Sequence, residues 1–323
     1  MTAKTTKTKK SDVDLSVDLA GIRMQNPLLT ASGTSGYATE LGDYLDLSKL
    51  GAFTTKSITL EPRAGNPSPR IVETPAGVIN SIGLANVGLE RFLAEKLHTA
   101  VSMGVPVFVN IAGKTVEEYV ELAARLDDVR DVAALEVNIS CPNVAAGGLE
   151  FGTDAQQAAE LIRRVRAVVK RAKLIVKLTP NVTDIRQIAR AAVDAGADIL
   201  SLINTVRGMV IDVERRRPTL PRGFGGLSGP AIHPVAVCAV WQVYKHVAQP
   251  AGVPLVGMGG VRTWQDALEF ILAGASAVAV GTALFVDPQS PITIIEGLTN
   301  YCRRHEVRKL SDLIGTVAEP TAE

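Results

Sequence analysis

Short apolar runs alternate with amphipathic segments along almost the whole chain, and this alternation constrains the fold more than any other feature of the sequence. The runs are continuous rather than alternately apolar and polar, which is typical of parallel strands buried on both faces. Eight strands are predicted: Pro27–Ala31, Ala52–Ser57, Val105–Ile111, Leu135–Ile139, Leu174–Leu178, Ile199–Ile203, Pro254–Gly257 and Ala277–Val280. Eight strand–helix units favour a closed barrel over an open doubly wound sheet, whose GxGxxG turn is replaced here by ASGTSG.

The segments between these runs have helical periodicity. Between Asp184 and Ala195, for example, Ile185, Ile188 and Ala192 recur on one helical face, and Gly196 then ends the helix. The predicted helices are Val116–Leu126, Ala155–Lys170, Asp184–Ala195, Pro234–Val247, Trp264–Ala273 and Pro291–His305. Strands that alternate with helices in this way predict a parallel sheet.

Two long connections interrupt the alternation. Residues 58–104 are predicted to form loops, a hairpin and one helix, and residues 206–233 are predicted to be loop-like. The basic cluster Arg215–Arg217 in the second connection is more typical of solvated surface than of a binding site. We predict an α/β fold, a single-domain (β/α)8 TIM barrel over residues 13–317. Long loop insertions lie at its C-terminal rim, and disordered tails occupy residues 1–12, which are basic, and 318–323.

Composition excludes several other classes of protein. Hydrophobic residues make up 46% and the net charge is +1, so a large core is expected and a nucleic-acid or membrane-surface partner is not. No apolar run reaches the ~18 residues that span a bilayer, and the basic N-terminus lacks the apolar stretch of a secretory signal, so we expect a cytoplasmic protein. The three cysteines and four histidines have neither disulfide nor metal-ligand spacing, so we expect no metal site.

Polar residues gather where the predicted strands end, which is where a (β/α)8 barrel has its active site. These residues are Ser32, Lys56, Ser57, Asn110, Asn138, Lys177, Asn204 and Thr205. The last two strands instead end in glycine-rich turns, Gly257–Gly260 and Gly281–Thr282, the usual place for a phosphate in this fold. The rim is therefore suited to a polar heterocycle that carries a phosphate, although the glycines also suit simple tight turns.

Two reactive side chains have alternative interpretations. Lys177 in the apolar run VKLTP is suited to stabilising a negative charge that develops during a reaction, but also to an aldolase Schiff base or to a lysine that extends to solvent. Cys141 follows a strand at the catalytic rim, although a free cysteine is more often a small buried hydrophobe. Cys238 and Cys302 lie within helical patterns, where that ordinary role is expected.

The motifs at the strand ends resemble those of class 1 dihydroorotate dehydrogenases. The similar segments include NPLLTASGT, TTKS, NSIGLAN, VNISCPN, VKLTP, GGLSGPAI, GMGG and VGTAL, and the resemblance extends from about Val13 to about Arg304. NTVRGMVID and GGLSGPAI are most similar to the NAD-linked class 1B catalytic subunit, with the fumarate-linked class 1A homodimer as the alternative. NSIGLANVG departs from the NAIGLQNPG-like run of the family but keeps Asn80 and Gly83.

The resemblance implies a cofactor, a substrate and a base. FMN would be bound by Ser32, Lys56, Ser57, Asn110, Asn138, Lys177, Ile203, Gly229, Gly259, Gly260, Gly281 and Thr282. Dihydroorotate would be bound by Lys56, Asn80, Ser81, Ile82, Gly83, Leu84, Asn138, Asn204 and Thr205. Cys141 would be the catalytic base.

The implied reaction oxidises (S)-dihydroorotate to orotate in UMP biosynthesis, with the C6 hydride going to N5 of FMN and the C5 proton to Cys141. Electrons would then pass to NAD+ through a partner subunit carrying FAD and a [2Fe–2S] cluster, within a heterotetramer built on a homodimer of this chain. A barrel aldolase or lyase acting on a phosphorylated substrate is one rival enzyme, and related flavin enzymes that reduce pyrimidines or tRNA uridines are the closest rival. A non-enzymatic scaffold is disfavoured by the intact polar rim, and a tRNA-modifying flavin enzyme by the net charge of +1.

Overall fold

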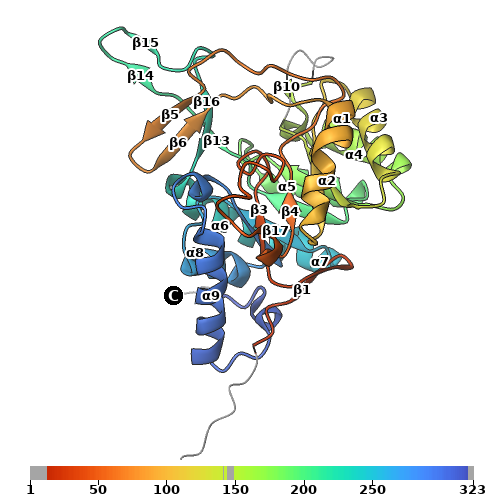
Figure 1. Cartoon of the computed structure of the whole chain (residues 1–323), viewed down its shortest axis with the longest axis vertical. Helices are drawn as coiled ribbons and strands as arrows, with labels where there is room; N and C mark the ends of the chain where they lie inside the picture. The colour runs from red at the N-terminus through yellow and green to blue at the C-terminus, as the bar shows by residue number, and fades with distance from the viewer. Residues whose placement is uncertain (1–12, 141, 144–148, 319–323) are drawn as a thin grey trace, which may run out of the picture.

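A closed parallel barrel forms the centre of the computed structural model, which describes residues 13–140, 142–143 and 149–318 (Figure 1). Its eight strands are arranged in the order β3-β18-β17-β12-β11-β8-β7-β4. A bridge between Leu29 and Ala52, and a hydrogen bond of 3.0 Å from the Thr54 backbone N–H to Thr30 Oγ1, join the two end strands. The strands are β3 (Leu28–Thr30), β4 (Phe53–Thr54), β7 (Val107–Ile111), β8 (Val132–Asn138), β11 (Lys173–Leu178), β12 (Ile199–Leu202), β17 (Leu255–Met258) and β18 (Ala277–Val280). All eight predicted strands are confirmed.

Helices surround the barrel, and the six predicted ones are confirmed. They are α3 (Val116–Asp127), α4 (Ala155–Val168), α5 (Ile185–Asp194), α6 (His233–Val243), α8 (Trp264–Leu272) and α9 (Ser290–Arg304). The single helix predicted within residues 58–104 is α1 (Leu89–Arg91), the π-helical η2 (Phe92–Lys96) and α2 (Leu97–Ser102) in succession. The helix predicted to end at Val247 continues through the π-helical η5 (Tyr244–Ala248) into α7 (Gln249–Ala251). Short 3₁₀ turns complete the helical segments: η1 (Leu47–Lys49), η3 (Phe151–Thr153), η4 (Pro230–Ile232), η6 (Thr282–Phe285) and η7 (Leu310–Leu313).

Side-chain caps determine where several of these helices begin. Asp184 accepts a hydrogen bond from the backbone N–H of Arg186, and Thr263 and Asp266 form a reciprocal capping box. Each cap satisfies N–H groups that the first helical turn leaves unpaired, so the chain turns into a helix soon after leaving the rim.

Two separate apolar cores hold the barrel together. The larger lies between the helices and the outer faces of the strands, and the smaller fills the inside of the barrel. A hairpin that the sequence did not reveal, β1 (Val17–Leu19) and β2 (Ile22–Met24), contributes Val17, Leu19 and Met24 to the inner core. Met24 also lies beside Gly51, just before β4, so this hairpin closes the N-terminal end of the barrel.

A second sheet stands over the other end of the barrel and extends away from it (Figure 1). It has the order β13-β16-β6-β5, and a further hairpin pairs β14 with β15. The strands are β5 (Ile71–Thr74), β6 (Gly77–Asn80), β13 (Val206–Gly208), β14 (Ile211–Asp212), β15 (Arg217–Pro218) and β16 (Gly225–Ser228). The hairpin predicted within residues 58–104 is confirmed as β5 and β6.

The prediction that residues 206–233 are loop-like is wrong, because they supply four of these strands. Glycine-rich β16 has little intrinsic strand propensity, but it pairs with β6 from a distant part of the chain. A Cβ at Gly225 would lie 2.3 Å from the backbone oxygen of Asn80, so the missing side chain allows the two strands to approach. The cluster Arg215–Arg217 is exposed on the β14–β15 hairpin, remote from the barrel interior.

Across residues 13–140, 142–143 and 149–318, none of the helices combines the length and the apolar character needed to cross a membrane. Over the same ranges, no group of three or more histidine, cysteine or acidic side chains is arranged to hold a metal ion.

Candidate active site at the C-terminal rim

A polar layer replaces the apolar core in the upper part of the barrel. Side chains two residues apart on a strand share a face, so the positions that follow the inner apolar core also point into the barrel. On β7, for example, Phe108 belongs to the inner core and Asn110 lies above it, and on β11 Ile175 is followed in the same way by Lys177. The buried polar residues at this level are Asn110, Glu136, Lys177 and Ser201.

Glu136 is the centre of this layer. Its Oε2 atom accepts a hydrogen bond of 2.5 Å from Asn110 Nδ2, and its Oε1 atom accepts one of 2.8 Å from Ser201 Oγ. Ser57 Oγ in turn donates to Asn110 Oδ1 at 2.5 Å. Glu136 is only 3% exposed, so its carboxylate is stabilised by these donors rather than by water.

Lys177 faces inward and is 5% exposed. Its Nζ atom lies 3.9 Å from Glu136 Oε2 and donates a hydrogen bond of 3.0 Å to Ser32 Oγ. The side chain therefore does not extend to solvent, which was one of its alternative interpretations. The ammonium group lies between the carboxylate of Glu136 and Ser32 in the segment after β3, where it can interact with a bound anionic group.

Sequence reasoning missed Glu136. The signal was present, because Glu136 is the single charged residue in the apolar run VAALEVN and lies two residues before Asn138, on the same strand face. A carboxylate at such a position requires buried partners, and these come from three other strands.

A second group of amides lies higher on the rim. Asn204 Nδ2 donates to Asn138 Oδ1 at 3.2 Å and to Ser140 Oγ at 2.9 Å, so two predicted substrate residues are in direct contact. Tyr119 fixes the backbone of Asn138 through a hydrogen bond of 2.7 Å to its carbonyl. Asn181, which was not predicted, donates to the carbonyl of Thr205 at 3.1 Å.

The predicted substrate run 80–84 is held beside this group. Asn80 Nδ2 donates to the carbonyl of Gly226 at 3.2 Å, and a Cβ at Gly226 would lie 2.0 Å from Thr205 Oγ1. Asn80 and Thr205 therefore both border Gly226.

Asn66 fixes the shape of the same run. Its side-chain amide donates to the carbonyl and hydroxyl oxygens of Ser81, both at 2.9 Å, and its backbone N–H donates to the carbonyl of Ile82 at 3.0 Å. Gly83 has φ +75°, and a Cβ there would lie 2.5 Å from Asn66 Oδ1. Leu84 follows with φ 56°, so the chain bends sharply at these two residues.

Glycine-rich segments meet on the remaining part of the rim. A Cβ at Gly260 would lie 2.8 Å from the carbonyl oxygen of Gly229, and a Cβ at Gly229 would lie 3.7 Å from Thr282 Cγ2. Thr282 Oγ1 also donates to Ser228 Oγ at 2.9 Å. The loops after β17 and β18 and the segment after β16 thus form one cradle of backbone, which is typical of phosphate sites.

The predicted FMN residues Ile203, Gly259 and Gly281 lie next to this cradle. A Cβ at Gly259 would lie 3.6 Å from the side chain of Ile203, and a Cβ at Gly281 would lie 3.3 Å from Ala31, which directly follows β3. Ile203, itself 3% exposed, therefore joins the cradle to the amide group around Asn204.

Lys56 is half-buried and lies two residues after the end of β4. Burial lowers the pKa of its ammonium group, and Arg70 lowers it further, whereas Glu40 acts in the opposite direction. Lys56 therefore loses its proton at a lower pH than a lysine on the surface does.

Cys141 lies outside the described residues. The next described elements in the chain are the short strands β9 (Pro142–Asn143) and β10 (Leu149–Glu150), which pair with each other. Glu150 forms an ion pair of 3.0 Å with Arg207 on β13, which joins β10 to the second sheet. Cys238 and Cys302 lie in α6 and α9, and burial raises the pKa of the Cys302 thiol.

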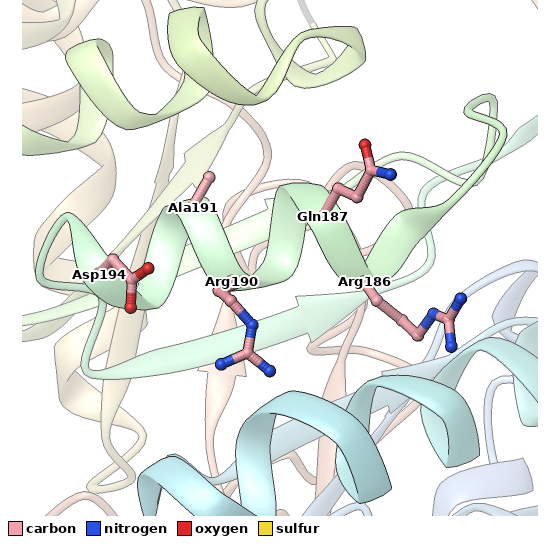
Figure 2. A pocket seen from close by; sticks show the side chains of 5 residues that line it. All are labelled: Arg186, Gln187, Arg190, Ala191 and Asp194. Atoms are coloured by element: carbon pink, nitrogen blue, oxygen red, sulfur yellow. The ribbon is translucent and has the colours of Figure 1, made fainter.

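A shallow surface hollow lies elsewhere, on the outer side of α5 (Figure 2). Arg186, Gln187, Arg190, Ala191 and Asp194 line it. None of the predicted site residues contributes to this hollow, so the rim remains the candidate site.

Comparisons with known proteins identify the family of the chain. The dihydroorotate dehydrogenase family model matches residues 14–301. A protein of Desulforudis audaxviator named dihydroorotate dehydrogenase B (NAD(+)), catalytic subunit, is 57% identical over 94% of this chain and 97% of its own length. Proteins of the same name from Geotalea uraniireducens and Pelobacter propionicus are 55% and 54% identical, each over 94% of this chain and 98% of their own length. The chain therefore belongs to the dihydroorotate dehydrogenase family.

Proposed function

We propose that this chain is the catalytic subunit of an NAD+-linked dihydroorotate dehydrogenase, which oxidises (S)-dihydroorotate to orotate in pyrimidine biosynthesis. The observation that carries the proposal is that one rim combines three features: a buried lysine beside a polar network, a group of amides, and a glycine cradle. The buried lysine and its network suit the isoalloxazine ring of FMN, the amides suit the pyrimidine substrate, and the glycine cradle suits the phosphate of FMN. The family and the names of the similar proteins support the same assignment.

FMN fits the residues that line this rim. The cradle of Gly229, Gly260 and Thr282 has backbone where side chains would collide, so N–H groups can approach a phosphate closely. Lys177 supplies a buried positive charge. We assign FMN binding to Ser32, Lys56, Ser57, Asn110, Asn138, Lys177, Ile203, Gly229, Gly259, Gly260, Gly281 and Thr282. When bound, FMN supplies the acceptor for the hydride that leaves C6 of the substrate.

The amide group is suited to a dihydropyrimidine. Asparagine side chains both donate and accept hydrogen bonds, so they match the alternating N–H and C=O groups of such a ring. Because buried amides left unpaired are unfavourable, a site of this kind rejects rings that lack those groups. We assign substrate binding to Lys56, Asn80, Ser81, Ile82, Gly83, Leu84, Asn138, Asn204 and Thr205.

Cys141 is the proposed base that removes the C5 proton. An unperturbed thiol has a pKa of about 8.5, so only a few per cent is thiolate at neutral pH. The rate of substrate oxidation should therefore rise towards alkaline pH. A rate that stays constant from neutral to alkaline pH, with chemistry rate-limiting, would contradict the role of Cys141.

Electrons leave through a second protein in this proposal. The similar proteins are named as catalytic subunits of an NAD(+) enzyme, which implies a separate electron-transfer subunit. We propose that this subunit carries FAD and a [2Fe–2S] cluster and joins a homodimer of this chain in a heterotetramer. The use of NAD+, an intracellular acceptor, supports a cytoplasmic location, and residues 13–317 form the proposed FMN-binding unit.

An anaerobic titration tests the proposal. The purified chain should show a flavin spectrum, and dihydroorotate should bleach it without the partner. Reoxidation should then require NAD+ and the partner subunit. Direct reoxidation by fumarate would instead indicate the class 1A reaction, and a chain that takes up no FMN would overturn the proposal.

A further inference from the structure

Glu136 is a buried carboxylate that no assignment above uses. It is in contact with two proposed FMN residues, since Asn110 donates to its Oε2 atom at 2.5 Å and Lys177 Nζ lies 3.9 Å from the same oxygen. Ser201 occupies the other oxygen at 2.8 Å. All four residues are at most 5% exposed, so protein groups surround the carboxylate.

The contacts of Glu136 orient the side chains of Asn110 and Lys177. Asn110 accepts from Ser57 through Oδ1 and donates to Glu136 through Nδ2, so its amide has one favourable orientation. Lys177 is held between Glu136 and Ser32 in a similar way. A neutral replacement at position 136 removes the anion that selects both orientations.

The charge of Glu136 matters as much as its shape. At 3.9 Å, in surroundings that contain little water, its negative charge offsets the positive potential of the Lys177 ammonium. Removing the carboxylate charge leaves that positive potential uncompensated at the rim. Any group bound there then gains electrons more readily.

We propose that Glu136 is a positioning residue that orients Asn110 and Lys177 and lowers the electron affinity of the bound flavin by offsetting the charge of Lys177. This inference rests on the proposed function, in which both residues contact FMN. It predicts that removing the negative charge and removing the positive charge move the flavin midpoint potential in opposite directions.

The experiment measures the midpoint potential of FMN bound to four variants of the full chain, by anaerobic reductive titration against a reference dye. Glu136→Gln should raise the potential and shift the equilibrium for flavin reduction towards the reduced form by at least about tenfold. Lys177→Met should lower the potential. Glu160→Gln, which removes the same charge from the exposed face of α4, is the matched control and should leave the potential unchanged.

Glu136→Asp separates charge from packing. It keeps the charge but withdraws the carboxylate from Lys177 by one methylene, so the potential should rise by less than in Glu136→Gln. If Glu136 only filled space, the nearly isosteric Glu136→Gln variant would leave the midpoint potential of FMN unchanged. If Glu136→Gln does not fold, Glu136→Asp decides the question, because an unshifted potential in that variant would overturn the inference.

Failure of the inference can be told from failure of the proposed function. A wild-type chain that takes up no FMN would overturn both. A wild-type chain that binds FMN, while Glu136→Gln leaves the potential unchanged or shifts it in the same direction as Lys177→Met, would overturn only the role of Glu136.

Discussion

The lower and upper layers of the barrel interior are built on the same strands but have opposite chemistry. The lower layer contains Phe108, Ile175 and Ile199, and the β1–β2 hairpin closes it from below. Two residues further along each strand, the upper layer contains Asn110, Lys177 and Ser201 around Glu136. The lower layer gains stability from apolar area removed from water, whereas the upper layer is tolerated only because each polar group has a partner.

This difference shows how a single scaffold separates stability from function. Parallel strands fix every second side chain inside the barrel, so the change from apolar to polar takes place within one repeat of the strand. Substitutions below that boundary should affect folding, and substitutions above it should affect cofactor binding or chemistry. Substitutions on either side of the boundary test this separation.

The largest effect is expected at the proposed base. Cys141→Ala should slow flavin bleaching by dihydroorotate by roughly 10²–10⁴-fold, the usual contribution of general base catalysis, with FMN content unchanged. Anaerobic stopped-flow measurement of the bleaching rate checks this. Cys238→Ala, which alters an exposed cysteine on α6, is the control and should behave as wild type. A bleaching rate of Cys141→Ala within a few-fold of the wild-type rate would contradict the role of Cys141 as the base.

A matched pair on β7 tests the boundary between the layers directly. Phe108→Ala should lower the free energy of unfolding by about 3–5 kcal/mol, because it opens a cavity in the lower core. Its folded fraction should still bind FMN with wild-type affinity. Asn110→Ala should cost about 1–3 kcal/mol, because it removes the hydrogen bonds that Asn110 makes with Glu136 Oε2 and Ser57 Oγ, and should also weaken FMN binding.

Urea unfolding and FMN titration measure both effects. The separation of the two layers would be refuted by a Phe108→Ala variant that loses FMN affinity at unchanged stability, or by an Asn110→Ala variant that binds FMN normally.

A second matched pair tests the glycine cradle. Gly260 has φ +70°, and a Cβ there would lie 2.8 Å from the carbonyl oxygen of Gly229. Gly260→Ala should therefore weaken FMN binding by roughly 10–100-fold, through backbone strain and a displaced cradle. Gly252 has a similar φ of +66° but open space around it, at the end of α7. Gly252→Ala should lower the free energy of unfolding by about 1 kcal/mol through its positive φ, without loss of FMN affinity. Equal FMN affinities in the two variants would show that the cradle does not bind the cofactor.

The smallest effect is a pH dependence at Lys56. Because burial lowers the pKa of this lysine, it loses its charge at a lower pH than an ordinary lysine. The KM for the anionic substrate should therefore rise as the pH increases through that lowered pKa, by up to about tenfold per pH unit. In Lys56→Arg the guanidinium stays charged, so the rise should disappear although the starting KM is higher. A KM that rises equally in both proteins would assign the titration to another group.

Much of the fold could be predicted because its signals are local. A strand buried on both faces appears as a continuous apolar run, and all eight barrel strands were found in this way. The β14–β15 hairpin and the strands β13 and β16 were missed because glycine-rich segments become strands only by pairing with a distant partner. The β1–β2 hairpin was missed for a related reason. Its apolar side chains are held by the inner core at the N-terminal end of the barrel, which forms from strands distant in the sequence.

By itself, the sequence determined the barrel, the rim on which polar residues gather, and the family. These depend on periodicity, on strand ends and on motifs that neighbouring residues carry. Only the tertiary structure decided which of those residues touch: that Asn204 meets Asn138, that Gly229 meets Gly260, and that Glu136 lies beside Lys177. The physical reason is that closing the barrel brings side chains from separate strands into one buried volume, where each polar group must find a partner that no local pattern specifies.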